Sequence, residues 1–436
     1  MSIGQKIKNA RKSLELSQQE LGGEEFTKGY ISQIEKDRVT PSMKVLIIIS
    51  ERLKLPISYF LDEENTNFKE LQEKFINGEN LFLQKKYNEA LETFNSIVDL
   101  NYDNKSSFYI LSTLYLGKCL FYLNKYTECI NILEKALENI SLLSLYENLI
   151  ECYKYIGDCK FILSNYISAI RDYNEALNLL KEKQLHLPNL KAKLLLNAGS
   201  AYSNMGNFKV AMEYFNKNID YCQKNHVTDT LLDCSARMGY CCFELGKYKE
   251  GKNYISKAIS INRSINFQMV NSEIYTTLGL IIAKEGMIAN GLKLLSKSMD
   301  IALSIGYEFG YNLNIVYWVS ILLDENKIDE AEAFAIKYLA SLEDAENKLP
   351  LYLLLGYLGS IYIKKGTIEQ GKLYMETAIK NCIDLNLYSE VSRYSKLLAD
   401  LLIEFNPTEA KHYYNLSIEY INKIYGVSLV TNDIIS

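Results

Sequence analysis

Proline, histidine and long apolar runs are all scarce in this chain of 436 residues. Only five prolines occur, which favours long uninterrupted helices because proline breaks the helical hydrogen-bond ladder. No stretch of about 18 apolar residues is present, and residues 1–13 are polar and charged, without the apolar segment of a signal peptide. We therefore expect no membrane span and a cytoplasmic protein.

The residues that most often carry catalysis or bind metals are also poorly placed. The nine cysteines are scattered without a CxxC pair, and the three histidines lie far from one another and from the cysteines. No phosphate-binding glycine loop and no nucleophile–base pair is visible. The sequence therefore predicts reduced core cysteines, no metal, no cofactor, no catalytic residue and no enzyme. A redox pair at the adjacent Cys241 and Cys242 is the minor alternative.

Charge divides the chain near residue 62. Residues 1–60 carry ten Lys/Arg and seven Asp/Glu, a net charge of +3. The remainder carries 38 Lys/Arg and 46 Asp/Glu, a net charge of −8. A basic segment suits a phosphate surface, and an acidic one is repelled by it. We therefore expect a first domain over residues 1–61, a polar linker over 62–67 and a second domain over 68–436.

Helix-starting signals are dense in the first domain. Ser17 and Glu20 have the spacing of a capping box, and Thr27 can cap a further helix. In that further helix Ile31 and Ile34 should point inward, with Lys28, Tyr30, Gln33 and Asp37 outward. Helices are expected over residues 3–14, 18–24, 28–36 and from Ser42 onward, followed by a short turn from Pro56 to Leu61.

These helices resemble the Xre-type helix-turn-helix of phage repressors. The resemblance is carried by the runs at 18–21, 30–35 and 41–42 and by the apolar positions from Leu53 to Leu61. The spacing from Gln18 to Ile31 is one residue shorter than is common, and Gly22-Gly23 replace the usual alanine-rich helix end. The resemblance implies a third helix in the major groove of a palindromic double-stranded operator. The implied DNA-binding residues are Gln18, Thr27, Lys28, Tyr30, Gln33 and Lys36, although Lys28 and Lys36 also suit an ordinary solvated face.

From residue 68 onward a pattern of small and bulky residues recurs about every 40 residues. Each copy has a small residue, a bulky one three positions later, a second small one at +12 and a bulky one at +16, as in Gly199, Ala211 and Phe215. A register kept over nine copies predicts stacked antiparallel helix pairs whose small residues allow close approach. The first small positions are Gly78, Gly117, Gly157, Gly199, Gly239, Gly279, Val319, Gly359 and Leu398.

The repeats resemble a lengthened tetratricopeptide repeat. The resemblance implies an all-α chain, with the helix-turn-helix domain followed by a right-handed superhelical solenoid of about nine hairpins. The first helix of each pair, the A helix, should line a concave groove at positions −6, −3, −2, +1, +4 and +5 from the first small residue. Asparagine offers a peptide unit a donor and an acceptor, and arginine binds carboxylates; ordinary wet surface is the alternative. The expected peptide-binding residues are Lys154, Asp158, Asn197, Ser200, Asn204, Arg237, Tyr240, Glu273, Thr277 and Tyr317.

Together the two parts resemble the peptide-pheromone receptors of Gram-positive bacteria, the RRNPP group that includes the PlcR, NprR, PrgX and Rgg types. The resemblance implies a quorum-sensing transcription regulator in which a short re-imported peptide binds the groove, alters a homodimer or higher homo-oligomer and so controls DNA binding. A DNA-binding scaffold for a protein partner and a phage lysis–lysogeny peptide receptor remain alternatives. A third is an enzyme, because solenoid relatives without the first domain can act on phosphoproteins.

Overall fold

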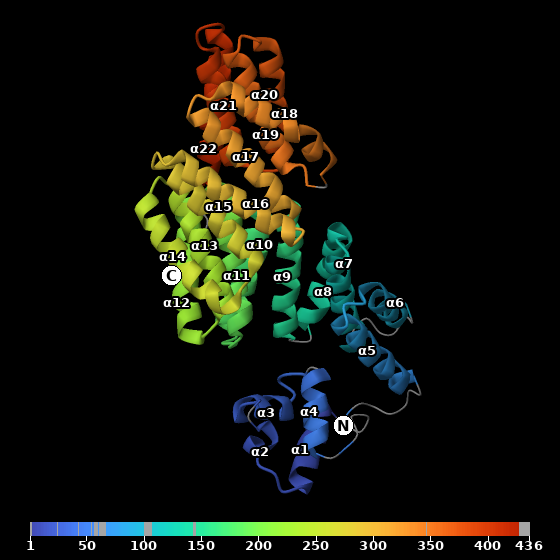
Figure 1. Ribbon diagram of the computed structural model, residues 1–436. Coiled ribbons are helices and arrows are strands. Elements are labelled where there is room, and N and C mark those ends of the chain that lie inside the picture. Colours follow the sequence, from blue (N-terminus) through green and yellow to red (C-terminus); the bar gives the residue numbers. More distant parts are fainter. Residues whose placement is uncertain are drawn as a thin grey trace. The chain divides into compact units, whose positions relative to one another are not determined.

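The computed structural model describes residues 2–23, 25–41, 43–53, 55, 60, 67–99, 107–142, 145–345 and 347–426. Within these ranges every regular element is a helix (Figure 1), and the predicted all-α class is confirmed. The chain divides into two compact units. Unit 1 comprises Met1–Leu163 with Glu175–Leu185, and unit 2 comprises Ser164–Asn174 with His186–Ser436.

The first four helices enclose a small apolar core. Ile7, Leu21, Ile31, Ile34 and Ile49 have no exposed surface, as the helical periodicity of the sequence predicts. The helices are α1 (Ile3–Ser13), α2 (Gln18–Gly22), α3 (Lys28–Glu35) and α4 (Met43–Leu53).

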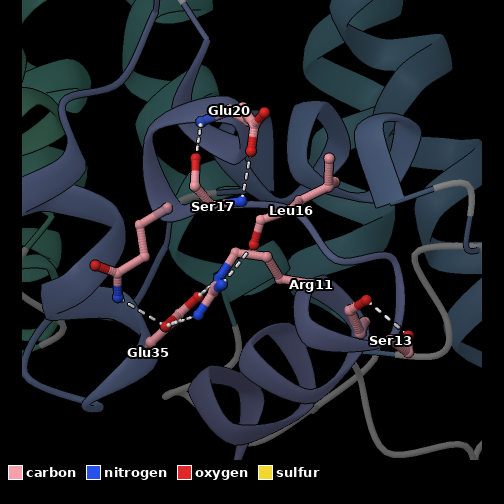
Figure 2. Close-up of polar contacts among 8 residues, drawn as sticks. Arg11, Ser13, Leu16, Ser17, Glu20 and Glu35 are labelled. Carbon is pink, nitrogen blue, oxygen red and sulfur yellow. Dashed lines mark hydrogen bonds and ion pairs between the residues drawn. The ribbon is translucent and has the colours of Figure 1, made fainter.

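The predicted caps are present. Ser17 Oγ accepts a hydrogen bond from the Glu20 backbone N at 3.1 Å, and Glu20 Oε2 accepts one from the Ser17 backbone N at 2.6 Å (Figure 2). Thr27 Oγ1 accepts from the Tyr30 backbone N at 3.2 Å. Local capping therefore defines where α2 and α3 begin. The predicted cap at Ser42 and the turn that starts at Pro56 lie outside the described residues.

Helix α2 ends at Gly22, earlier than the sequence predicts, because Gly23 and Arg52 terminate it. Arg52 Nη1 donates to the carbonyl oxygens of Leu21 at 2.9 Å and Gly22 at 2.5 Å, so a cation lies at the carbonyl end of the helix. Gly23 has φ +56°, and a Cβ there would lie 2.6 Å from Arg52 Nη2. Gly23, one of the two glycines that replace the usual alanine-rich helix end, therefore makes room for this guanidinium.

The remaining helices form nine consecutive pairs in the described part of the chain, which confirms the predicted number of hairpins. Each pair consists of an A helix and a following B helix. The pairs are α5 (Asn67–Leu83) and α6 (Tyr87–Val98), α7 (Ser107–Tyr122) and α8 (Tyr126–Leu142), α9 (Tyr146–Ile162) and α10 (Tyr166–Glu182), α11 (Pro188–Asn204) and α12 (Phe208–Asn225), α13 (Thr228–Glu244) and α14 (Tyr248–Ile265), α15 (Gln268–Lys284) and α16 (Ile288–Ser304), α17 (Glu308–Asp324) and α18 (Ile328–Asp344), α19 (Leu349–Lys364) and α20 (Ile368–Asp384), and α21 (Tyr388–Leu402) and α22 (Pro407–Gly426).

Packing inside each pair explains the repeating pattern. A Cβ added at Gly199 would lie 2.6 Å from Cε1 of Phe215, sixteen residues later, so the small residue receives the bulky one. A Cβ at Gly371 would lie 2.5 Å from the carbonyl oxygen of Gly359, twelve residues earlier, so the two small residues bring the backbones together. The positions that recur in the sequence are therefore the contacts between the A and B helices.

Three contacts within unit 2 join residues more than 180 positions apart in the sequence. Asn207 Nδ2 donates to the Ile424 carbonyl oxygen at 3.0 Å, and Asn386 Nδ2 donates to the Ser164 carbonyl oxygen at 3.1 Å. A Cβ at Gly206 would lie 2.4 Å from Cβ of Ser389. We call these three the closing contacts, because they join the early repeats of unit 2 to α21, α22 and the turn before them.

The nine cysteines are all buried and free, in agreement with the predicted core role. Burial raises the pKa of Cys241 to about 12 and that of Cys242 to about 11, so neither thiol forms much reactive thiolate at neutral pH. Among the described helices none is both long and apolar enough to span a bilayer. The predicted linker is described only at Asn67, which already belongs to α5, so the predicted domain boundary stays a prediction.

Candidate DNA-binding surface and ligand pocket

A buried ion pair joins the first three helices. Arg11 Nε on α1 lies 2.5 Å from Glu35 Oε1 on α3, and its Nη2 lies 3.0 Å from Glu35 Oε2 (Figure 2). Gln18 Nε2 on α2 donates to the same Glu35 Oε2 at 2.9 Å, and Arg11 Nη1 donates to the Leu16 carbonyl oxygen at 2.6 Å. Burial raises the pKa of Glu35, but the bonds from Arg11 and Gln18 outweigh it and hold that pKa below its usual value. The Gln18 amide that was expected to contact DNA is thus already bonded within the protein.

The predicted DNA-contacting residues of α3 are largely available. Thr27, Lys28, Gln33 and Lys36 are exposed, and no hydrogen bond or ion pair engages the last three side chains within the described residues. Tyr30 is half-buried, with its ring centroid 5.7 Å from that of Phe26. The structure therefore leaves two lysines and one glutamine of this region directed at solvent.

Asp37 lies outward as predicted, yet it has a structural task that sequence spacing did not reveal. Its Oδ1 accepts from the Gly4 backbone N at 3.0 Å and its Oδ2 from Ser2 Oγ at 2.6 Å. This carboxylate therefore caps the first turn of α1 from 33 residues away. The sequence around Asp37 carries no local signal for that pairing.

The predicted peptide-binding residues fall in both units. Lys154 and Asp158 belong to unit 1, where Lys154 Nζ pairs with Asp158 Oδ2 at 2.6 Å and lies 4.2 Å from the Tyr155 ring centroid. The other eight residues belong to unit 2. The structure accordingly brings together only part of the predicted set.

Two of the eight residues in unit 2 lie deeper than expected. Ser200 is 4% exposed and donates to the Leu196 carbonyl oxygen at 2.8 Å, and Thr277 is 5% exposed. Consecutive A helices contact each other directly, α11 with α13 and α13 with α15, and so cover the flanks of each A helix. The expectation that these two positions avoid the core is therefore wrong, whereas Asn197 and Asn204 are half-exposed on α11.

A charged cluster surrounds Arg237 on α13. Burial lowers the pKa of Arg237, but Glu273 and Asp233 raise it above its usual value. Burial raises the pKa of Asp233 to about 6, although Arg237 lowers it. Tyr307 donates from its hydroxyl to Glu273 Oε1 at 3.2 Å, and the buried Arg237 Nε has no hydrogen-bond partner within the described part of the chain. Arg237 thus faces two carboxylates of its own chain, which weakens the expectation that it binds a carboxylate of a ligand.

A cavity of about 380 Å³ opens on the A-helix side of unit 2. Five A helices contribute to its wall: α13, α15, α17, α19 and α21. Tyr317 lines it, and the Tyr317 hydroxyl donates to that of Tyr240 at 3.4 Å, across two repeats. We call this cavity the A-helix pocket; its polar and aromatic lining residues include Phe243, Glu244, Tyr248, Lys284, Tyr317, Asp324, Tyr357 and Arg393.

Glu244 and Arg393 line this pocket but were absent from the predicted set. Glu244 lies at +5 from Gly239, a position that the repeat register assigned to the groove, so the sequence held a usable signal for it. Arg393 precedes its repeat's first small position by five residues, which the register does not single out. In the described residues no group of three or more potential metal ligands comes together.

Family models match successive parts of the chain. The model described as "Helix-turn-helix domain" matches residues 4–66. Two models described as "Tetratricopeptide repeat" match residues 109–182 and, in two copies, 192–225 and 233–265. This chain joins a helix-turn-helix domain to tetratricopeptide repeats. A further model, "Anaphase-promoting complex, cyclosome, subunit 3", matches residues 47–136.

Known proteins share parts of this architecture. The immunity repressor protein of Bacillus phage phi105 is 32% identical over 90 residues, which are 20% of this chain and 62% of the repressor. A Rap protein complexed with competence and sporulation factor has a TM-score of 0.62 at 14% identity, covering 82% of this chain and 99% of that one. NprR in complex with its cognate peptide NprX has a TM-score of 0.58 at 16% identity, covering 81% and 99%. At these identities the two structures show the fold alone.

The predicted combination of a helix-turn-helix domain with a tetratricopeptide solenoid is thereby confirmed, and RRNPP-type proteins are among its structural neighbours. The chain matches less than two thirds of the length of the phage repressor.

Proposed function

We propose that this protein is a cytoplasmic transcription regulator whose helix-turn-helix domain binds a palindromic DNA operator as a homodimer, under the control of a short signalling peptide held on the A-helix side of unit 2. The observation that carries the proposal is the joining of an exposed α3 to a repeat domain whose A helices share a pocket. The structure of NprR in complex with its cognate peptide NprX has a similar repeat fold, which supports a peptide as the ligand.

Exposure and charge support the DNA-binding half of the proposal. Lys28, Gln33 and Lys36 present two cations and one amide to solvent, and glutamine can pair with an adenine edge in the major groove. The net charge of +3 over residues 1–60 is small. Two copies on one operator double the number of phosphate contacts, and a symmetric site is the usual target of helix-turn-helix dimers.

Selection from a random double-stranded DNA library with the full-length protein tests this half. The variant with Lys28→Ala and Gln33→Ala should lose the selected sequence, measured by fluorescence anisotropy. Lys12→Ala, at an exposed lysine of α1, serves as the control and should change affinity only slightly. Undiminished DNA binding by the double variant would show that α3 does not contact the DNA.

Calorimetry of the full-length protein with pooled synthetic hexapeptides and heptapeptides tests the peptide half. Binding heat from at least one pool, together with a changed affinity for the selected DNA, is the expected result. DNA binding without any peptide heat would favour the alternative, a DNA-binding scaffold for a protein partner.

A further inference from the structure

The A-helix pocket has the size for one side chain rather than for a whole peptide. Its volume of about 380 Å³ lies at the lower end of ligand sites, which span roughly 300–1,000 Å³. Residues from five A helices converge on it, so a group that enters it contacts repeats spread over unit 2. The pocket is therefore suited to an anchoring residue of the proposed peptide.

Most charges of the pocket are already neutralised within the protein. Lys284 Nζ pairs with Asp324 Oδ2 at 2.6 Å, and Arg393 pairs with Glu390. Glu325 lies exposed at the rim, where water solvates it. Among the described residues of the wall, these pairs leave no free cation for an anionic ligand.

Glu244 is the exception among the lining charges. It is half-buried at the end of α13, and no cation lies within ion-pair distance of it in the part of the chain that the structure describes. Burial raises the pKa of Glu244, and the charge of Glu390 adds to the rise. The charges of Arg393 and Lys284 and a hydrogen bond with Tyr240 act in the opposite direction, but the pKa stays above its usual value. A carboxylate in such a place is poorly solvated and gains from a cation that reaches it.

The rest of the wall suits the carbon chain and the charge of such a cation. Tyr317, Tyr357 and Phe243 present aromatic rings to the pocket, and aromatic faces attract ammonium and guanidinium groups. Long basic side chains also pack their methylene groups along apolar surface, which Leu280 and Ile321 supply here.

We propose that the A-helix pocket binds a cationic group of the peptide ligand, with Glu244 as the residue that selects it. This inference rests on the proposed function, since it assumes that a peptide binds unit 2. The cation can be a lysine or arginine side chain or the α-ammonium of the peptide. Each would complete the ion pair that Glu244 lacks.

Affinity selection of random hexapeptides by the full-length protein tests this inference, with a library that has free N-termini and one that is N-acetylated. The wild-type pool should be enriched in lysine or arginine at one position in both libraries if a side chain enters. Enrichment only in the free library would identify the α-ammonium. The best peptide should bind Glu244→Gln about tenfold more weakly, the range expected for one charged hydrogen bond.

Glu213→Gln is the matched control, because it removes the same charge at an exposed position of α12 outside the pocket lining and should leave affinity and selection unchanged. A thermal unfolding curve of Glu244→Gln that matches the wild type would exclude misfolding as the cause of weaker binding. Binders without a basic group, or full affinity in Glu244→Gln, would overturn the inference and leave the proposed function intact. A wild-type protein that selects no peptide would overturn both.

Discussion

Glu35 links the first three helices through one buried carboxylate. It is 4% exposed and receives bonds from Arg11 on α1 and Gln18 on α2, so three short helices depend on it. The same bonds orient α3, whose exposed residues are proposed to contact DNA. A change at Glu35 should therefore alter both the stability of the domain and the geometry of its DNA-binding surface.

Glu35→Gln should destabilise the packing of the first three helices by about 3 kcal/mol, because it leaves Arg11 buried without its counter-charge. Hydrogen–deuterium exchange in α1 and α3 of the full-length protein measures the effect, and α13 should remain unchanged. Glu51→Gln, at an exposed position of α4, is the control. Equal protection of α3 in wild type and Glu35→Gln would show that the ion pair contributes little.

The same pair predicts a pH dependence. The pKa of Glu35 is lowered in the folded domain, so its stabilising effect is complete above the ordinary value of 4.5 and is lost as the pH falls through the lower folded-state value. Protection of α3 in the wild type should fall in that acid range. Glu35→Gln should show a weaker pH dependence there, since it cannot titrate, and an unchanged profile would contradict the assignment.

At the scale of elements, local signals predicted much of the fold. Ser17, Glu20 and Thr27 located the starts of α2 and α3, because a cap is decided by atoms within three residues. The repeat register located all nine pairs, because the +12 and +16 positions are contacts within one hairpin. Ends that depend on distant groups were missed, as at Gly22, where Arg52 from α4 terminates α2.

The site was less predictable than the helices. The register gives the angle of a side chain around its A helix, but not how far a neighbouring A helix covers it. Ser200 and Thr277 were expected in the groove and are buried, while Glu244 had a groove position and was overlooked. The sequence could not single out the Glu244 carboxylate, because its lack of an ion pair depends on the pairs that Lys284 and Arg393 form in other repeats.

Gly199→Ala tests the packing rule of the repeats. The added Cβ would lie 2.6 Å from Phe215 Cε1, so we expect a loss of about 1–3 kcal/mol from overpacking. This exceeds the gain of about 1 kcal/mol that alanine brings to a helix. Denaturant unfolding followed by the fluorescence of the single tryptophan, Trp318, measures the change in unit 2.

Phe215→Leu provides the matching change on the B helix. It removes ring atoms that the new methyl group would strike, so the double variant should lose less stability than the sum of the two single variants. Additive losses would mean that Gly199 and Phe215 are not coupled and that the +16 register reflects something other than direct contact.

At the scale of the whole chain, the division into compact units falls inside the third repeat and not where the charge changes near residue 62. Helix α10 contributes to both units, and its Asn174 accepts a hydrogen bond from Tyr214 of α12 at 3.1 Å within unit 2. Contacts of this kind join repeat to repeat, so a solenoid has no sharp internal boundary. The boundary predicted from charge and composition stays a prediction.

The closing contacts give unit 2 a property that stacked neighbours alone do not supply. A solenoid whose repeats contact only their neighbours opens from its ends, and the last helix is the first to be lost. In unit 2 the end of α22 is bonded to Asn207, 217 residues earlier, so its opening must also break this bond. A ligand that contacts several A helices would therefore bind a unit 2 whose early and last repeats are already bonded to each other.

Asn207→Asp isolates that bond. The carboxylate keeps the acceptor that caps α12 through the Val210 backbone N, but it loses the donor to the Ile424 carbonyl oxygen. Asn207 is 2% exposed, so leaving that carbonyl unsatisfied should cost about 1–3 kcal/mol. Hydrogen–deuterium exchange in the last turns of α22 should therefore quicken, while α12 keeps its protection.

Asn225→Asp is the matched control, because Asn225 Nδ2 donates at 2.8 Å to the Tyr221 carbonyl oxygen of its own helix. It makes the same chemical change without touching the closing contacts, so α22 should exchange at the wild-type rate. If Asn207→Asp also left α22 unchanged, the bond from Asn207 to the Ile424 carbonyl oxygen would not stabilise the last helix. Faster exchange confined to α22 would show that a single amide in the fourth repeat stabilises the ninth.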